Sequence, residues 1–137
     1  MNKVFLDTNI IIDFLTNRQP FSIEAAKIFE LSVKGELKIY ISSLSINNIH
    51  YIVSRLESKK KALNLINKLL PLVEILPVIR STIEKTILAE FKDFEDGLQN
   101  FCAEEGNLNT IITRNIKDFS KSKLSIQTPK EYLISKF

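Results

Sequence analysis

Acidic and amide side chains follow several short apolar runs of this sequence, and their types could carry chemistry. Asp7 comes directly after Val4–Leu6, and Thr113-Arg114-Asn115 follows Ile111-Ile112. Carboxylate and amide oxygens are the ligands that hard cations such as Mg²⁺ and Mn²⁺ prefer. A cation held by such groups polarises a phosphodiester and lowers the pKa of an attacking water. The residue types therefore favour metal-assisted phosphodiester hydrolysis.

A second group of acids lies in the segment Asp93-Phe94-Glu95-Asp96, which opens a predicted helix. Asp93 and Asp96 share one face of that helix because they are three residues apart. Asp118 is a further carboxylate, soon after the fourth apolar run. These acids and the groups that follow the apolar runs indicate one site only if folding brings them together.

Structural explanations exist for some of these acids taken singly. Asp7 has the residue type of a helix N-cap, and Asp93 and Glu95 would favour the positive end of a helix dipole. No single acid is therefore diagnostic, and the combination carries the prediction.

Composition excludes several other chemistries. The chain has 137 residues with 19 Lys and Arg, 16 Asp and Glu, and a net charge of +3, which permits a nucleic-acid partner without requiring one. Its single histidine and single cysteine, His50 and Cys102, exclude Cys/His zinc sites and internal disulfides. No Walker-type Gly-rich loop is present. No apolar run approaches the length of a membrane span, so we expect a cytoplasmic protein without a membrane partner.

The elements that must position these residues follow from periodicity and turn signals. We expect strands at 4–6, 37–41, 73–78, 110–113 and, more weakly, 124–126. We expect helices at 10–16, 22–34, 43–56 with Ser43 as its cap, 61–70, 81–91 after a capping box at 81–84, 94–105, and from a second capping box at 128–131. Strands separated by helices imply right-handed crossovers and a parallel sheet covered on both faces. The predicted fold class is α/β, in one domain over residues 1–137.

Parallel α/β sheets place their sites beyond the carboxyl ends of the strands. In this sequence those positions hold Asp7-Thr8-Asn9, Ser42-Ser43 and Thr113-Arg114-Asn115. We therefore expect these polar groups to meet at one edge of the sheet.

Four blocks of the sequence resemble the PIN domain family and occur in the family's order. They are 4–13, 41–49, 93–98 followed by Ala103, and 111–119. The resemblance implies a three-layer α/β/α sandwich with a central, mainly parallel sheet of about five strands. It also implies a Mg²⁺- or Mn²⁺-dependent ribonuclease, typically the VapC-like toxin of a bacterial toxin–antitoxin pair. Such toxins cleave RNA, form homodimers and are silenced by a protein antitoxin that occupies the site.

The resemblance also assigns roles by position. Asp7 and Asp96 match the first and third metal-binding acids of the family. Asn48 and Asn115 stand where the second and fourth acids are usually found, and each amide removes one negative charge. Asp118 or Asp93 could compensate for that loss.

The predicted site combines these assignments with the residues at the strand ends. We expect Asp7, Asp96 and Asp118 to hold the metal, with Asn48 and Asn115 completing the catalytic site. The expected supporting and substrate-binding residues are Asn9, Thr113, Asp93, Ser42 and, for substrate, Arg114.

The leading hypothesis is a divalent-metal-dependent endoribonuclease with RNA as substrate, an antitoxin as partner and a homodimeric state. The two amides leave a second hypothesis open, a catalytically degenerate PIN fold that binds RNA or protein without cutting. A third is a small phosphoesterase or phosphotransferase that acts on nucleotides.

Overall fold

The strands of the molecule form one parallel sheet in the order β3-β2-β1-β4-β5. The structure is a computed structural model that describes residues 2–136. The strands are β1 Asn2–Leu6, β2 Leu37–Ser42, β3 Glu74–Leu76, β4 Thr110–Ile112 and β5 Ser125–Gln127. The helices are α1 Thr8–Leu15, α2 Phe21–Val33, α3 Ser43–Leu56, α4 Lys59–Leu69, α5 Arg80–Ala89, α6 Phe94–Glu105 and α7 Pro129–Ser135, with short 3-10 turns η1 Leu70–Leu72 and η2 Ile116–Phe119.

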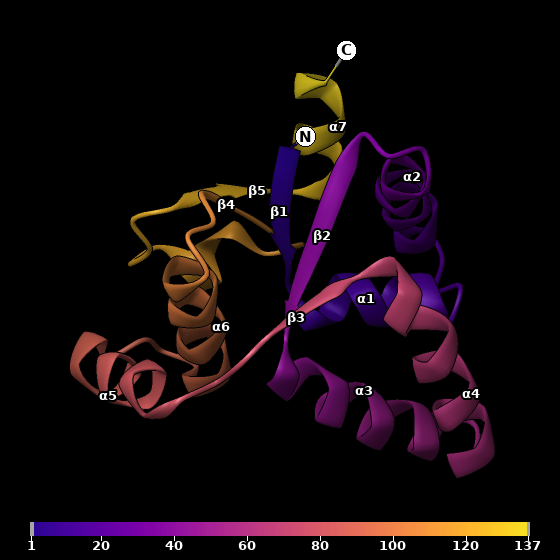
Figure 1. Cartoon of the computed structure of the whole chain (residues 1–137), viewed down its shortest axis with the longest axis horizontal. Coiled ribbons are helices and arrows are strands. Elements are labelled where there is room, and N and C mark those ends of the chain that lie inside the picture. The colour runs from indigo at the N-terminus through magenta and orange to yellow at the C-terminus, as the bar shows by residue number, and fades with distance from the viewer. Residues whose placement is uncertain (1, 137) are drawn as a thin grey trace.

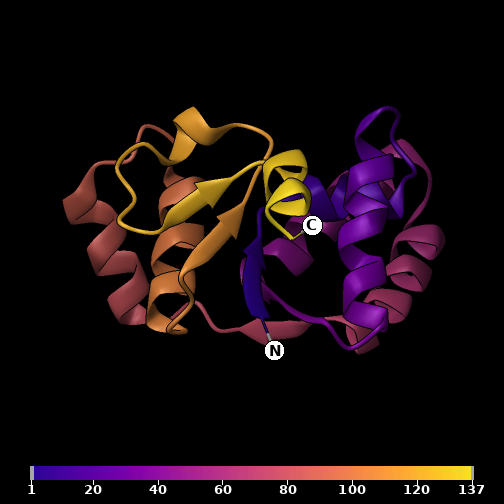
Figure 2. The same cartoon turned by 90° about the horizontal axis from the view of Figure 1, so that it is seen from above.

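Helices cover both faces of the sheet. Helices α1 to α4 lie on one side and α5 and α6 on the other, as Figures 1 and 2 show from two directions. Helix α7 packs against α2 and β5, so it joins the first side. The three-layer α/β/α arrangement with five strands is the predicted fold, which is confirmed.

Alternation along the central strand explains why both faces are apolar. In β1, Val4 and Leu6 belong to the core under α1–α4, whereas Phe5 belongs to the core under α6. Strand β4 divides in the same way, with Ile112 on the first side and Ile111 on the second. Successive strand residues point to opposite faces, so a strand buried on both faces is apolar throughout.

Local signals placed most helix ends well, with exceptions at α3, α4 and α5. The N-cap of α3 is Ser42, not Ser43, because the Ser42 hydroxyl accepts hydrogen bonds from the next turn. Helix α4 begins at Lys59, two residues before the predicted start at 61.

The predicted capping box at 81–84 is wrong. Helix α5 begins at Arg80, and Thr82 Oγ1 accepts the backbone N–H of Ile79 at 3.1 Å. The hydroxyls of Ser81 and Thr82 donate instead to the Glu105 carboxylate on α6. Ser81, which the sequence pattern assigned to a local cap, therefore forms a tertiary contact, while Glu84 pairs with Arg80 on its own helix.

The predicted capping box at 128–131 is confirmed. Thr128 Oγ1 accepts the Glu131 backbone N–H at 3.1 Å, and Glu131 Oε1 accepts the Thr128 N–H at 2.9 Å. These reciprocal bonds start α7, with Pro129 at its first position.

The order of the strands places a topological switch point at β1. The chain moves from β1 outward through β2 to β3, then returns to the other side of β1 to form β4 and β5. The loops that leave β1 and β4 therefore diverge, and the crevice between them is the usual ligand site of such sheets. Within residues 2–136, no helix is both long and apolar enough to cross a membrane.

Candidate active site at the carboxyl end of the central strand

Asp7 follows β1 directly and is the anchor of this site. Its side chain is only 6% exposed. Gln99 Nε2 donates to Asp7 Oδ1 at 2.9 Å, and Thr113 Oγ1 donates to Oδ2 at 2.8 Å. Burial raises the pKa of Asp7, and these hydrogen bonds partly oppose that shift. The carboxylate is thus held in one orientation by residues from α6 and from the end of β4.

A cavity of about 340 Å³ opens beside Asp7. Carboxylates from three segments line it: Asp7 after β1, Asp93, Glu95 and Asp96 at the start of α6, and Asp118 in η2. The rest of the lining is Thr8, Asn9, Asn48, Tyr51 and Ile52. Folding therefore brings Asp7 and Asp96 to one cavity although they are far apart along the chain. We call this the acid pocket.

The first turn of α6 supplies three of these acids. Asp93 is the N-cap of the helix and accepts the backbone N–H of Asp96 at 3.0 Å. Burial, followed by repulsion from Asp7 and then from Asp93, raises the pKa of Asp96 to about 7. At neutral pH this carboxyl is therefore partly protonated in the protein without a cation.

Glu95 is a residue of the acid pocket that sequence reasoning missed. Its Oε1 accepts hydrogen bonds from the Asn48 side-chain amide and from Thr8 Oγ1, the latter at 3.4 Å. Burial raises the Glu95 pKa, the Asn48 hydrogen bond lowers it, and the charge of Asp7 raises it. In the sequence, Glu95 has a sufficient explanation as an acid at the positive end of the helix dipole. No spacing rule pairs it with a residue on a different helix.

Gln99 was also missed, although a signal for it existed. It lies one turn after Asp96 on α6, at the i, i+3 spacing that places two side chains on one face. Its amide oxygen accepts the Thr8 backbone N–H at 3.1 Å, while its nitrogen donates to Asp7. Gln99 thus orients both Asp7 and the start of α1.

The other predicted residues divide into those at the pocket and those away from it. Asn9, Asn48, Asp93 and Asp118 line it, and Thr113 holds Asp7.

Asn115 and Ser42 are placed differently from the prediction. Asn115 is exposed and stands outside the lining, although its backbone N–H donates to Thr113 Oγ1 at 3.2 Å. Ser42 is fully buried as the cap of α3, so its hydroxyl serves the helix and does not line the pocket.

Arg114 also points elsewhere than predicted. Its Nε lies 2.9 Å from Oδ2 of the fully buried Asp13 in α1, and its guanidinium covers the ring of Phe21 at 4.1 Å from the centroid. A buried carboxylate is costly without a partner charge, which explains why Arg114 turns toward Asp13. Arg114 therefore forms an ion pair within the protein, and its contact with substrate stays a prediction.

The acid pocket has the donor chemistry of a hard-cation site. Within residues 2–136, no three or more His, Cys, Asp or Glu side chains are grouped closely enough to hold a metal ion as they lie. Mg²⁺, however, commonly takes one or two carboxylates and keeps several waters. The raised pKa values of Asp7, Glu95 and Asp96 reflect burial and mutual repulsion, which a divalent cation would offset. The oxygen donors of the pocket therefore fit such an ion.

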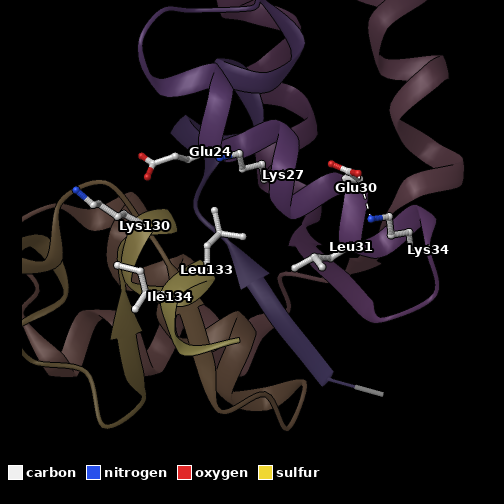
Figure 3. A pocket seen from close by; sticks show the side chains of 8 residues that line it. All are labelled: Glu24, Lys27, Glu30, Leu31, Lys34, Lys130, Leu133 and Ile134. Carbon is white, nitrogen blue, oxygen red and sulfur yellow. Dashed lines mark ion pairs between the residues drawn. The ribbon is translucent and has the colours of Figure 1, made fainter. Parts of the chain in front are cut away.

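A larger cavity, of about 610 Å³, lies between α2 and α7. Figure 3 shows its lining, with Leu31, Leu133 and Ile134 surrounded by charged side chains of both signs. It shares no residue with the acid pocket. Its lining offers neither a carboxylate cluster nor a buried polar group, so the acid pocket is the better candidate for chemistry.

Comparison with known proteins defines the class. Residues 3–117 match the PIN domain family. The chain is also 32% identical over 138 residues to Ribonuclease VapC1 of Aquifex aeolicus (strain VF5), covering 95% of this chain and 92% of that protein. The protein thus belongs to the PIN domain family, as its sequence blocks predicted.

Solved structures share the same fold. DNA-bound VapBC from Salmonella typhimurium matches with a TM-score of 0.74 at 18% identity, covering 94% of this chain and 99% of that chain. VapBC2 from Rickettsia felis, bound to a DNA fragment from its promoter, matches with a TM-score of 0.73 at 21% identity, covering 92% and 98%. At these identities the likeness concerns the architecture.

Proposed function

We propose that this protein is a divalent-metal-dependent endoribonuclease and the toxin of a bacterial toxin–antitoxin pair. The observation that carries the proposal is the acid pocket, where five carboxylates from three segments converge at the carboxyl end of β1. Membership of the PIN domain family and 32% identity to a protein named as a ribonuclease support it.

Mg²⁺ or Mn²⁺ is the proposed cofactor. Asp7 and Asp96 would hold it, with Asp118 contributing from η2. When bound, the cation would polarise the phosphodiester and lower the pKa of water. Asn48 would act through its hydrogen bond to Glu95, and Asn115 through the backbone bond that helps to orient Thr113.

The chain's own residues would prepare the site for that chemistry. Gln99 and Thr113 fix both oxygens of Asp7, so its remaining lone pairs face the pocket in a constant direction. Asp93 caps α6 and thereby sets the position of Asp96. Such preorganisation means that little rearrangement is required when a substrate binds.

A protein antitoxin and a second copy of this chain are the proposed partners. The fold neighbours include VapBC assemblies from several bacteria, which supports an antitoxin. For the homodimer, α5 offers an apolar exposed face formed by Ile79, Ile83, Ile87 and Leu88. Light scattering on the isolated chain would test the homodimer.

An RNA-cleavage assay in Mn²⁺ tests the activity. We expect the parent to cut RNA and both Asp7→Asn and Asp96→Asn to lose most of that activity. Glu36→Gln is a matched control that removes one negative charge from an exposed position away from the pocket, and it should cut like the parent. Equal rates for all four proteins would reject the mechanism. A protein that binds RNA but neither cleaves it nor binds Mn²⁺ would favour the degenerate module.

A further inference from the structure

An exposed tyrosine stands at the mouth of the acid pocket. Tyr51 of α3 is among the lining residues and is 59% exposed. Within residues 2–136, the other exposed large aromatic side chains are Phe21 and Phe94. Neither Phe21 nor Phe94 is part of the pocket lining. Tyr51 is therefore the exposed aromatic group that faces the acid pocket.

Arg55 contacts Tyr51 through both its hydroxyl and its ring. It lies one turn further along α3, and its Nη1 donates to the Tyr51 hydroxyl at 2.9 Å. Its guanidinium carbon is 5.4 Å from the ring centroid. Within the described part of the chain, Arg55 forms no ion pair with a carboxylate. Because a guanidinium has five N–H donors, most remain free for another acceptor.

The charge of the acid pocket explains why such a group is needed. Five carboxylates repel the phosphates of an approaching polyanion, and one divalent cation would offset only part of their charge. We therefore expect groups beside the acids to add substrate affinity. An aromatic face attracts any nucleobase without regard to charge, and unpaired RNA bases stack on such faces. A free guanidinium next to it supplies the contact to phosphate.

We propose that Tyr51 and Arg55 form a substrate-positioning site, in which one unpaired base of a single-stranded RNA stacks on the ring face of Tyr51 opposite Arg55, while Arg55 contacts an adjacent phosphate. The stripe Asn48, Tyr51, Arg55 runs along one face of α3 from the pocket outward, so a strand held there would lead its backbone to the acids. This inference rests on the proposed ribonuclease function and specifies how that site holds its substrate.

The absence of tryptophan in the sequence makes a direct test possible. Tyr51→Trp would introduce a single tryptophan whose fluorescence reports stacking, and Val33→Trp, at a 71% exposed position on α2, is the matched control. Both are made on the Asp96→Asn background in Mn²⁺ so that RNA stays intact. We expect a short single-stranded RNA to quench the tryptophan of Tyr51→Trp but not that of Val33→Trp. A fully paired duplex should quench the tryptophan of Tyr51→Trp less.

Kinetics on the otherwise unchanged protein complete the test. We expect Tyr51→Leu to raise KM for single-stranded RNA about tenfold, a typical effect of losing one stacked base, and to raise KM more than it lowers kcat. Tyr51→Phe, which keeps the ring, should retain most of the affinity. Arg55→Gln should weaken RNA binding and reduce its salt dependence.

The outcomes separate this inference from the function on which it rests. Cleavage by the parent together with equal quenching in the two tryptophan variants, or with an unchanged KM in Tyr51→Leu, would overturn the stacking site alone. Absence of RNA cleavage by the parent and of quenching in both variants would reject the ribonuclease proposal and the stacking site together.

Discussion

Asn48 of α3 donates a hydrogen bond to Glu95 of α6, although 47 positions separate the two residues in the chain. The bond joins the two helices across the mouth of the acid pocket, where both side chains belong to the lining. The bond places the Glu95 carboxylate of α6 beside α3, where the chain has the amide Asn48 at a position that is usually acidic in the PIN domain family. Glu95 consequently adds its charge to those of Asp7 and Asp96.

Removing that charge should have opposite effects on folding and on metal binding. We expect Glu95→Gln to raise the melting temperature of the metal-free protein at neutral pH, because repulsion from Asp7 and Asp96 is relieved. The same variant should bind Mn²⁺ several-fold more weakly, as titration calorimetry would measure. Glu36→Gln serves as the control for loss of a charge. Unchanged Mn²⁺ affinity would show that Glu95 has no part in holding the cation.

Stability of the metal-free protein should depend on pH through Asp96. Its pKa in the folded state is about 7, against 3.8 for the ordinary side chain. Between these values the folded protein holds a proton that the unfolded chain has released, so the free energy of unfolding falls as pH rises from about 4 to about 7. Raised pKa values of Asp7 and Glu95 act in the same direction. Calorimetric melting in EDTA across this range would measure the slope, and Asp96→Asn should flatten it; an equal slope in that variant would contradict the assignment.

Addition of Mn²⁺ should stabilise the folded protein, and more so at neutral than at acidic pH. A cation that binds only the folded state raises the melting temperature by mass action. Protonated carboxyls compete with it, so the gain should shrink as pH falls through the pKa of Asp96. Thermal melts with and without Mn²⁺ provide the measurement. Asp7→Asn is expected to lose most of the stabilisation, and a gain of the same size in that variant would place Mn²⁺ elsewhere.

The ion pair between Asp13 and Arg114 should matter for stability. Asp13 is fully buried, and Arg114 is 26% exposed. Arg114→Gln would leave the carboxylate without its partner, and we expect a loss of about 2 kcal/mol, less than for a fully buried pair. The double variant Asp13→Asn, Arg114→Gln should lose less than the sum of the two single variants in chemical denaturation. Additive losses would mean that the two side chains act independently.

Local patterns in the sequence determined much of the architecture. Helix α6 was predicted at 94–105 with Gly106 as its stop, and it has those bounds, because caps act over a single turn. The parallel sheet followed from apolar runs separated by helices. The placement of Asp7 at the pocket followed from the rule that parallel sheets bind ligands at the carboxyl ends of their strands, whereas Asp96 was assigned to the same site by the resemblance to the PIN domain family.

Tertiary packing decided the orientation of the side chains. Asn48 and Glu95, and likewise Asp7 and Gln99, meet only because α3 and α6 converge on the end of β1. Arg114 follows a strand end, where the sequence pointed to substrate, yet the buried charge of Asp13 draws it to α1. Sequence patterns report which face of an element a residue occupies. The partner that each polar side chain finds depends on which elements pack together and on the cost of leaving a buried charge alone.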